Sequence, residues 1–187
     1  MIPFFSIFSN TKETLKKTQE NPEAKIDTNN ISMFMALGIA MWLPALFVEQ
    51  PTQVENITFK IFSFIMIVGL SVVMGKFVIN YIYLGISRLL KGNATKLQIE
   101  TVIAFSLVPK ILALPIVLIL LQIDNYYSLA LTKGPLFTII DIIVLIFFIK
   151  IIFQGLHFFN GFGVSKTLIT ISPMIIILIV TNLMAII

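Results

Sequence analysis

The sequence predicts an all-α integral membrane protein, a bundle of about five transmembrane helices with a tandem repeat of helical hairpins. The first observation is the composition. The mean hydropathy is +1.01, and 58% of the 187 residues are hydrophobic whereas only 12% are charged, a balance that soluble domains do not have. The second is a series of five apolar runs, each near the roughly 20 residues that a helix needs to cross a bilayer. The third is a polar pattern that occurs in two of these runs.

The first two apolar runs differ in length. The first covers residues 31–48 and fits a single span. The second starts near Phe59 and is too long for one crossing. At about 1.5 Å per residue, Lys76 lies roughly 26 Å from Phe59, near the opposite edge of a hydrocarbon core about 30 Å thick. We therefore expect residues 59–79 to cross the membrane and residues 80–90 to continue along its surface as an amphipathic helix.

The remaining three runs predict spans at residues 101–122, 135–153 and 167–187. Pro109 and Pro115 lie inside the first of these three. Proline is tolerated in a transmembrane helix because neighbouring helices and local adjustments satisfy the freed backbone groups. We expect Pro115 to loosen this span locally.

Lysine and arginine in the short loops predict the orientation. The loop after the second run carries Arg88, Lys91 and Lys96, whereas the loops on the other side are less basic. This bias places the N-terminus in the cytoplasm and the C-terminus outside. The chain then divides into a cytoplasmic, amphipathic and charged N-terminal arm, residues 1–29, and a five-span transmembrane domain, residues 30–187.

A polar pattern occurs twice, each time near the cytoplasmic end of a span. In both copies a lysine is followed by polar residues at i+4 and i+7, which share one face of a helix. The six residues are Lys76, Asn80, Tyr83, Lys150, Gln154 and His157. Each copy leads into a turn with a small residue, a hydroxyl and a lysine, at 92–96 and 161–166. We expect one hairpin used twice, with both faces lining a cytoplasmic groove for a partner's segment or for anionic lipid headgroups.

Four charged side chains lie inside or at the ends of the expected spans. Each needs either a polar or oppositely charged partner or access to water. The ammonium groups of Lys76 and Lys150 either snorkel to the membrane surface or have a functional or helix-pairing role. Lys110 and Asp141 lie deeper and at comparable depths of neighbouring spans. Because an unpaired charge in lipid is expensive, we expect these two residues to form an intramembrane ion pair.

The residue content predicts a protein that is not an enzyme. The chain has one histidine and no cysteine, and no two acidic residues fall within one expected span. Acid–base catalysis and carboxylate-rich metal sites therefore lack their usual residues, and no phosphate-binding loop is present. We expect no catalytic residues, no metal site and no cofactor.

Several short motifs resemble the Yip1 domain family of five-span membrane proteins. They are the stretch Ser9–Leu15 followed by Glu20-Asn21-Pro22, the turn 92–96, and Ala104-Phe105-Ser106-Leu107-Val108-Pro109, which is similar to the family's Ala-Tyr-Ser-x-x-Pro signature with Phe in place of Tyr. The resemblance implies an integral membrane adaptor. Eukaryotic members bind prenylated Rab GTPases through a long N-terminal region, and the short arm and the composition of this chain fit a bacterial member in the cell membrane better.

The resemblance also implies a class of partner. Some bacterial members accompany ABC-type exporters, so we expect a non-enzymatic accessory or immunity subunit that works with a membrane transporter or organises membrane partners. The partners would be membrane lipids and another membrane protein, and no nucleic acid. The alternatives are a small permease or flippase-like transporter, because the two hairpins run in the same direction as parallel repeats do, and a purely structural component of a larger complex.

Overall fold

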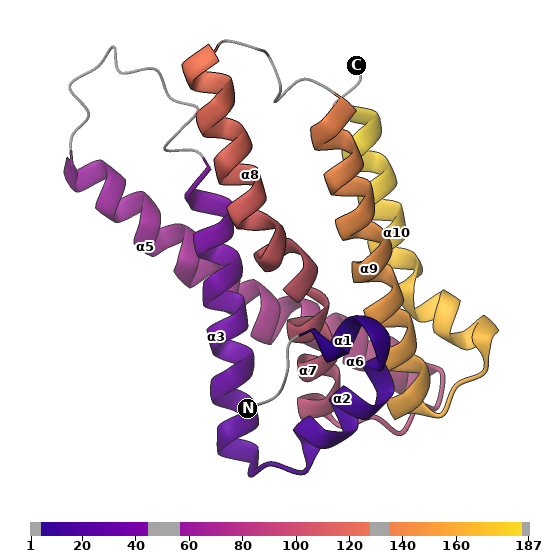
Figure 1. Cartoon of the computed structure of the whole chain (residues 1–187). Helices are drawn as coiled ribbons and strands as arrows, with labels where there is room; N and C mark the ends of the chain where they lie inside the picture. The colour runs from indigo at the N-terminus through magenta and orange to yellow at the C-terminus, as the bar shows by residue number, and fades with distance from the viewer. Residues whose placement is uncertain (1–4, 45–56, 128–134, 185–187) are drawn as a thin grey trace.

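The structure is a computed structural model, and it describes residues 5–44, 57–127 and 135–184. Every regular element in these residues is a helix, as the sequence predicts (Figure 1). The elements are, in chain order, α1 Ser6–Ser9, α2 Thr11–Gln19, α3 Glu23–Trp42, α5 Ile57–Val73, the π-helical η1 Met74–Ile79, α6 Asn80–Leu89, α7 Lys96–Ser106, α8 Val108–Tyr127, α9 Pro135–Asn160 and α10 Val164–Met184.

Within the described residues, three continuous helical stretches are long and apolar enough to cross a membrane; the first joins α5, η1 and α6, the second joins α7 and α8, and the third is α9. They cover Ile57–Leu89, Lys96–Asp124 and Leu136–Asn160, and a shorter apolar helix covers Val164–Ile176. In the most apolar window of the first helix only 6% of the residues are buried inside the protein. Apolar side chains face outward in this way when lipid rather than water surrounds the protein. The molecule is therefore an all-α membrane bundle.

The helix boundaries match the expected spans in part. At residue 80, where we expect the chain to turn onto the membrane surface, η1 ends and α6 continues directly from it. The expected division between residues 29 and 30, by contrast, falls inside α3, which starts at Glu23 directly after Pro22. Residues 45–48 of the first expected span and 185–187 of the last lie outside the described residues.

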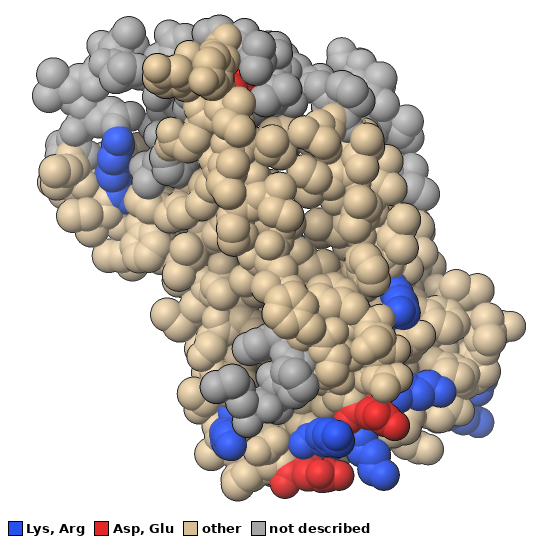
Figure 2. Space-filling view, viewed as in Figure 1, with Lys and Arg blue, Asp and Glu red and all other residues tan. Residues whose placement is uncertain are grey.

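One end of the bundle holds α1, α2 and the two tight turns that follow α6 and α9 (Figure 1). We call it the turn end. On the face seen in Figure 2, most of the charged side chains gather there, and the middle of the molecule is largely uncharged. The turn end therefore contains the polar chemistry of the protein.

Helix α3 packs closely against the helix formed by α5 and η1. A Cβ atom on Gly38 would lie 2.7 Å from Cα of Val68, and one on Gly75 would lie under 3.0 Å from the ring of Phe34. Small residues at such crossings let transmembrane helices approach closely. This contact positions η1 beside the middle of α3.

The third expected span is two helices, because the chain bends between α7 and α8. Pro109 has no N–H to donate to the carbonyl of Phe105, so the α-helical ladder is interrupted there. Leu107 lies between the two helices, and its carbonyl accepts from the backbone N–H groups of Lys110 and Ile111. Pro115, where we expected the loosening, lies inside α8. The bend lets α7 pack in the core while α8 diverges.

The hairpin repeat is visible in the backbone. A long helix ends in a turn with one residue in the left-handed region, Lys91 (φ 63°) after α6 and Gly161 (φ 66°) after α9. A second helix, α7 or α10, then runs back from the turn end. Helices commonly end in this way because the left-handed residue redirects the chain.

The N-terminal arm packs on the bundle rather than apart from it. Ile7 and Leu15 are fully buried, and the helices α1 and α2 contact α9 and α7. The Phe8 ring meets the ring of Phe147 on α9 edge to face, with centroids 4.9 Å apart. The lysines of α2, such as Lys16, point outward. The helices α1 and α2 are thus amphipathic, and their apolar face belongs to the core.

Candidate functional site

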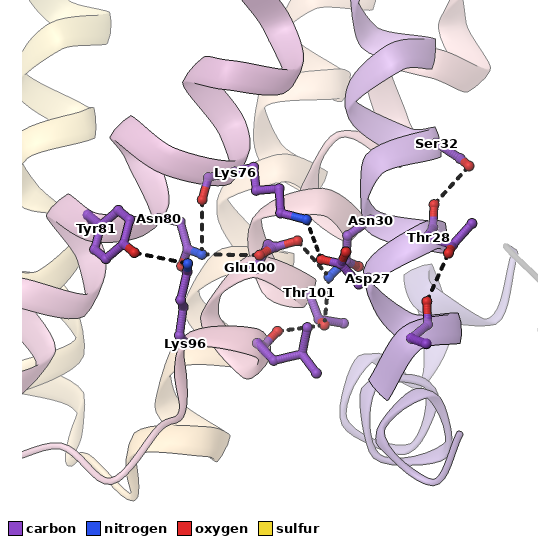
Figure 3. Close-up of polar contacts among 12 residues, drawn as sticks. Asp27, Thr28, Asn30, Ser32, Lys76, Asn80, Tyr81, Lys96, Glu100 and Thr101 are labelled. Carbon is purple, nitrogen blue, oxygen red and sulfur yellow. Dashed lines mark hydrogen bonds and ion pairs between the residues drawn. The ribbon is translucent and has the colours of Figure 1, made fainter. Parts of the chain in front are cut away.

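A carboxylate lies in the centre of the turn end. Glu100 on α7 is only 1% exposed. Its two oxygens accept hydrogen bonds from the side-chain amides of Asn30 on α3, at 3.4 Å, and Asn80 on α6, at 3.3 Å (Figure 3). Burying a carboxylate is costly unless hydrogen bonds or opposite charges balance it. Three helices therefore meet at Glu100.

An ion pair closes one side of this network. The ammonium of Lys76 in η1 lies 2.5 Å from a carboxylate oxygen of Asp27 on α3. The Lys76 side chain is 19% exposed and that of Asp27 is 40% exposed. Figure 3 shows both beside Glu100. A hollow of about 310 Å³ opens at this place, with Lys76, Asp27 and Glu100 in its lining.

The hydroxyl of Thr101 extends the network to the arm. It accepts from the amide of Asn30 at 3.2 Å and from the amide of Gln19 on α2 at 3.1 Å. It donates to the carbonyl of Leu97. One polar network thus joins α2, α3, η1, α6 and α7.

Two local features of the sequence place these side chains. The N-terminus of α7 is fixed by a capping box in which Thr95 accepts from the Gln98 N–H and Gln98 accepts from the Thr95 N–H, which puts Glu100 in the first turns of a helix. The π-helical segment η1 changes the angular spacing after Val73, and π-helical segments often occur at functional sites. Within it the Lys76 carbonyl accepts from Asn80 at 3.3 Å.

The two turns are joined by Asn160, the last residue of α9. Its side-chain oxygen accepts from the hydroxyl of Ser87 and from the backbone N–H of Ala94, at 3.3 Å for the latter. A Cβ atom on Gly92 would lie under 3.0 Å from Asn160, Ser87 and Phe162. Asn160 and Ser87 are both buried. We call this contact the turn clasp, and it ties the first hairpin to the second.

The second lysine of the repeated pattern holds the arm. The ammonium of Lys150 donates to the backbone carbonyl of Phe8 at 2.7 Å and lies 5.8 Å from the ring centroid of Phe147. Neither Lys76 nor Lys150 is fully exposed. Both ammonium groups therefore have polar partners within the protein.

The six pattern residues do not gather in one place. Lys76 and Asn80 belong to the Glu100 network, whereas Lys150 reaches the arm, and α7 packs against both of their helices. Tyr83 is 4% exposed. Gln154 is half-buried, and the half-buried ring of His157 stacks on that of Phe153, with centroids 6.0 Å apart. The residues of the two copies of the pattern therefore make separate contacts within the protein.

Lys110 and Asp141 line the same cavity, as their expected depths imply. The cavity has a volume of about 690 Å³ and lies between α3, α8 and α9. In the part of the chain that the structure describes, no ion pair within 4.0 Å joins the two side chains. The two side chains therefore share a cavity, and the predicted ion pair between them is not confirmed.

Sequence reasoning missed the residues at the centre of the site. Glu100 was placed just outside the third span, and Asp27 and Asn30 were placed near the boundary of the arm. The capping box Thr95–Gln98 was the signal that the helix starts before Glu100. Pro22 followed by Glu23 was the corresponding signal for α3. Neither signal reveals which helices become neighbours.

The fold and the site define a class of protein, an all-α multi-pass membrane protein whose hairpins and N-terminal arm are joined by buried polar contacts at one end. The Yip1 domain matches residues 13–185, and the chain belongs to the Yip1 domain family. No curated protein and no solved structure shows a significant match to this chain.

Proposed function

We propose that the protein is a non-enzymatic membrane adaptor, an accessory or immunity subunit that works with a membrane transporter such as an ABC-type exporter or that organises other membrane partners. The construction of the turn end carries this proposal. Its polar side chains make contacts between helices: Glu100 and Asn160 accept from other side chains, and Lys150 donates to the backbone carbonyl of Phe8. A catalytic site needs polar groups that are free to change hydrogen-bond partners during the reaction. A docking surface for another protein needs polar groups that stay in fixed positions.

The turn end would face the cytoplasm of a bacterial cell, in its inner membrane. Arg88, Lys91, Lys96 and Lys166 lie in or beside the two turns. Short loops rich in lysine and arginine stay on the cytoplasmic side. A partner's juxtamembrane segment or anionic lipid headgroups would contact these basic residues.

The test replaces Lys76 and Lys150, the two lysines whose ammonium groups make contacts within the turn end. Lys76→Leu with Lys150→Leu deletes the contacts to Asp27 and to the Phe8 carbonyl while leaving the spans apolar, so membrane insertion should be unchanged. We expect the tagged variant to lose the proteins that co-purify with the wild type in mild detergent.

The matched control is Lys110→Leu with Asp141→Leu, which removes two charges from the other cavity and leaves the turn end intact. We expect this variant to keep its partners. If the Lys76/Lys150 variant keeps every partner and the cell keeps its phenotype, the turn end is not the docking site.

A small permease or flippase-like transporter is the second candidate. The cavity that contains Lys110 and Asp141 favours it, because charged residues at membrane depth mark the path of a substrate in many transporters. Purified protein alone, reconstituted in liposomes, would then move a substrate, and the Lys110/Asp141 variant would not. An adaptor shows no flux in either form.

A further inference from the structure

The bend between α7 and α8 opens a groove on the side of α3 away from α5. The volume of the groove is about 490 Å³. One wall is α3 and the other consists of Phe105 on α7 and of Val108, Ile111 and Leu112 on α8. The groove is separate from both cavities described above, which have different linings.

The polarity of the groove changes along its length. Its α3 wall presents Lys25, Asn29, Ser32 and Ala36, which lie on one helix face at i, i+4, i+7 and i+11. The end near Lys25 is polar and lies at the turn end, and the end near Ala36 is apolar. Eleven residues of helix span roughly 16 Å, which is about half of a hydrocarbon core of about 30 Å. The groove therefore has the depth of one leaflet.

The charge at the polar end belongs to Lys25. Lys25 is exposed, and among the described residues its ammonium makes no ion pair or hydrogen bond. The side chain of Asn29 lies one turn further along and is half-buried. A phosphate group placed here would meet a cation and an amide donor.

We propose that this groove binds an anionic glycerophospholipid of the leaflet at the turn end. The phosphate would lie beside Lys25 and Asn29, and an acyl chain would extend along Met33 and Ala36 toward Leu112. An amphiphile matches a groove that is cationic at one end and apolar at the other. The inference goes beyond the adaptor role and does not depend on a partner protein.

The test uses phosphatidylglycerol with a photoreactive acyl chain, added to the full-length protein in phosphatidylcholine nanodiscs. Wild-type protein should be labelled on peptides that contain 33–36 or 108–112. Lys25→Gln should lower the labelling about fivefold, the equivalent of about 1 kcal/mol for one basic residue near the membrane surface. Lys16→Gln is the matched control, because Lys16 is exposed and lies outside the groove, and it should leave the labelling unchanged.

A second pair of variants tests the apolar half. Ala36→Trp fills the groove and should abolish labelling at these peptides, whereas Met35→Trp, at an exposed position one residue away, should not. Equal labelling by a zwitterionic phosphatidylcholine analogue would show that the groove is ordinary lipid-facing surface. Labelling that is unchanged in Lys25→Gln would also overturn the proposal.

Discussion

Gly155 allows α9 to approach α7, and its replacement by alanine should destabilise the protein although alanine is the better helix former. A Cβ atom at this position would lie 2.6 and 2.7 Å from the two γ-methyl groups of Val102 and 3.1 Å from Leu15. Rotation of Val102 about χ1 cannot remove the clash, because both methyl groups are in the way and a β-branched side chain is stiff. Val102 is fully buried, so neither helix can yield without repacking.

The size of the effect follows from two opposing terms. Replacing glycine by alanine within a helix contributes about 1 kcal/mol of stabilisation. Overpacking a closely packed contact costs about 1–3 kcal/mol. The net effect at Gly155 should therefore be a loss of up to about 2 kcal/mol. Gly85 is the matched control, because it is helical and has no heavy atom within 4 Å of its Cβ position. Gly85→Ala should stabilise the protein.

Thermal unfolding of purified protein in one detergent measures both changes. The fluorescence of Trp42, the only tryptophan, and circular dichroism both follow the transition. A change of 1 kcal/mol corresponds to about 2–4 °C in a chain of this size. Val102→Ala should lower the midpoint by itself and should rescue Gly155→Ala in the double variant, with a coupling energy of at least about 0.5 kcal/mol. A rise in midpoint with Gly155→Ala, equal to that of Gly85→Ala, would refute the close approach of α7 and α9.

Three further predictions address the turn end and the topology. Lys76→Met should lower the free energy of unfolding by about 1 kcal/mol because it leaves the Asp27 carboxylate unpaired. Asp27→Asn in the same chain should restore the unfolding midpoint. A double variant that is no more stable than the single one would argue against the ion pair. Asn160→Ala should lower stability by about 2 kcal/mol because the N–H of Ala94 loses its acceptor, and the turn should become more sensitive to trypsin; unchanged proteolysis would count against the turn clasp. Single cysteines at Asn93 and Asn125 should react with an impermeant reagent from opposite sides of the membrane, and equal labelling in intact cells would exclude the proposed topology.

Much of the fold follows from local features of the sequence. The apolar runs predicted the long helices, whereas the course of residues 80–90 along the membrane surface stays a prediction. The division of the third span at Leu107 did not follow, because a proline such as Pro115 is also accommodated inside a helix. The candidate site was predicted only in part. Lys76 and Asn80 were recognised, whereas Asp27, the partner of Lys76, was assigned to the arm and Glu100, the partner of Asn80, was placed outside the spans.

The sequence by itself determined the class of protein, the family and the positions of most helices, because hydropathy and helix caps act along one segment of chain. Only the tertiary structure decided which polar groups meet. Lys76 pairs with Asp27, 49 residues away, and Asn30 bonds to Glu100, 70 residues away. In lipid the apolar surface of a helix does not distinguish the face that packs on protein from the face that meets acyl chains. The neighbours of each helix are therefore set by close contacts such as Gly38, Gly92 and Gly155, which become visible only once the helices are assembled.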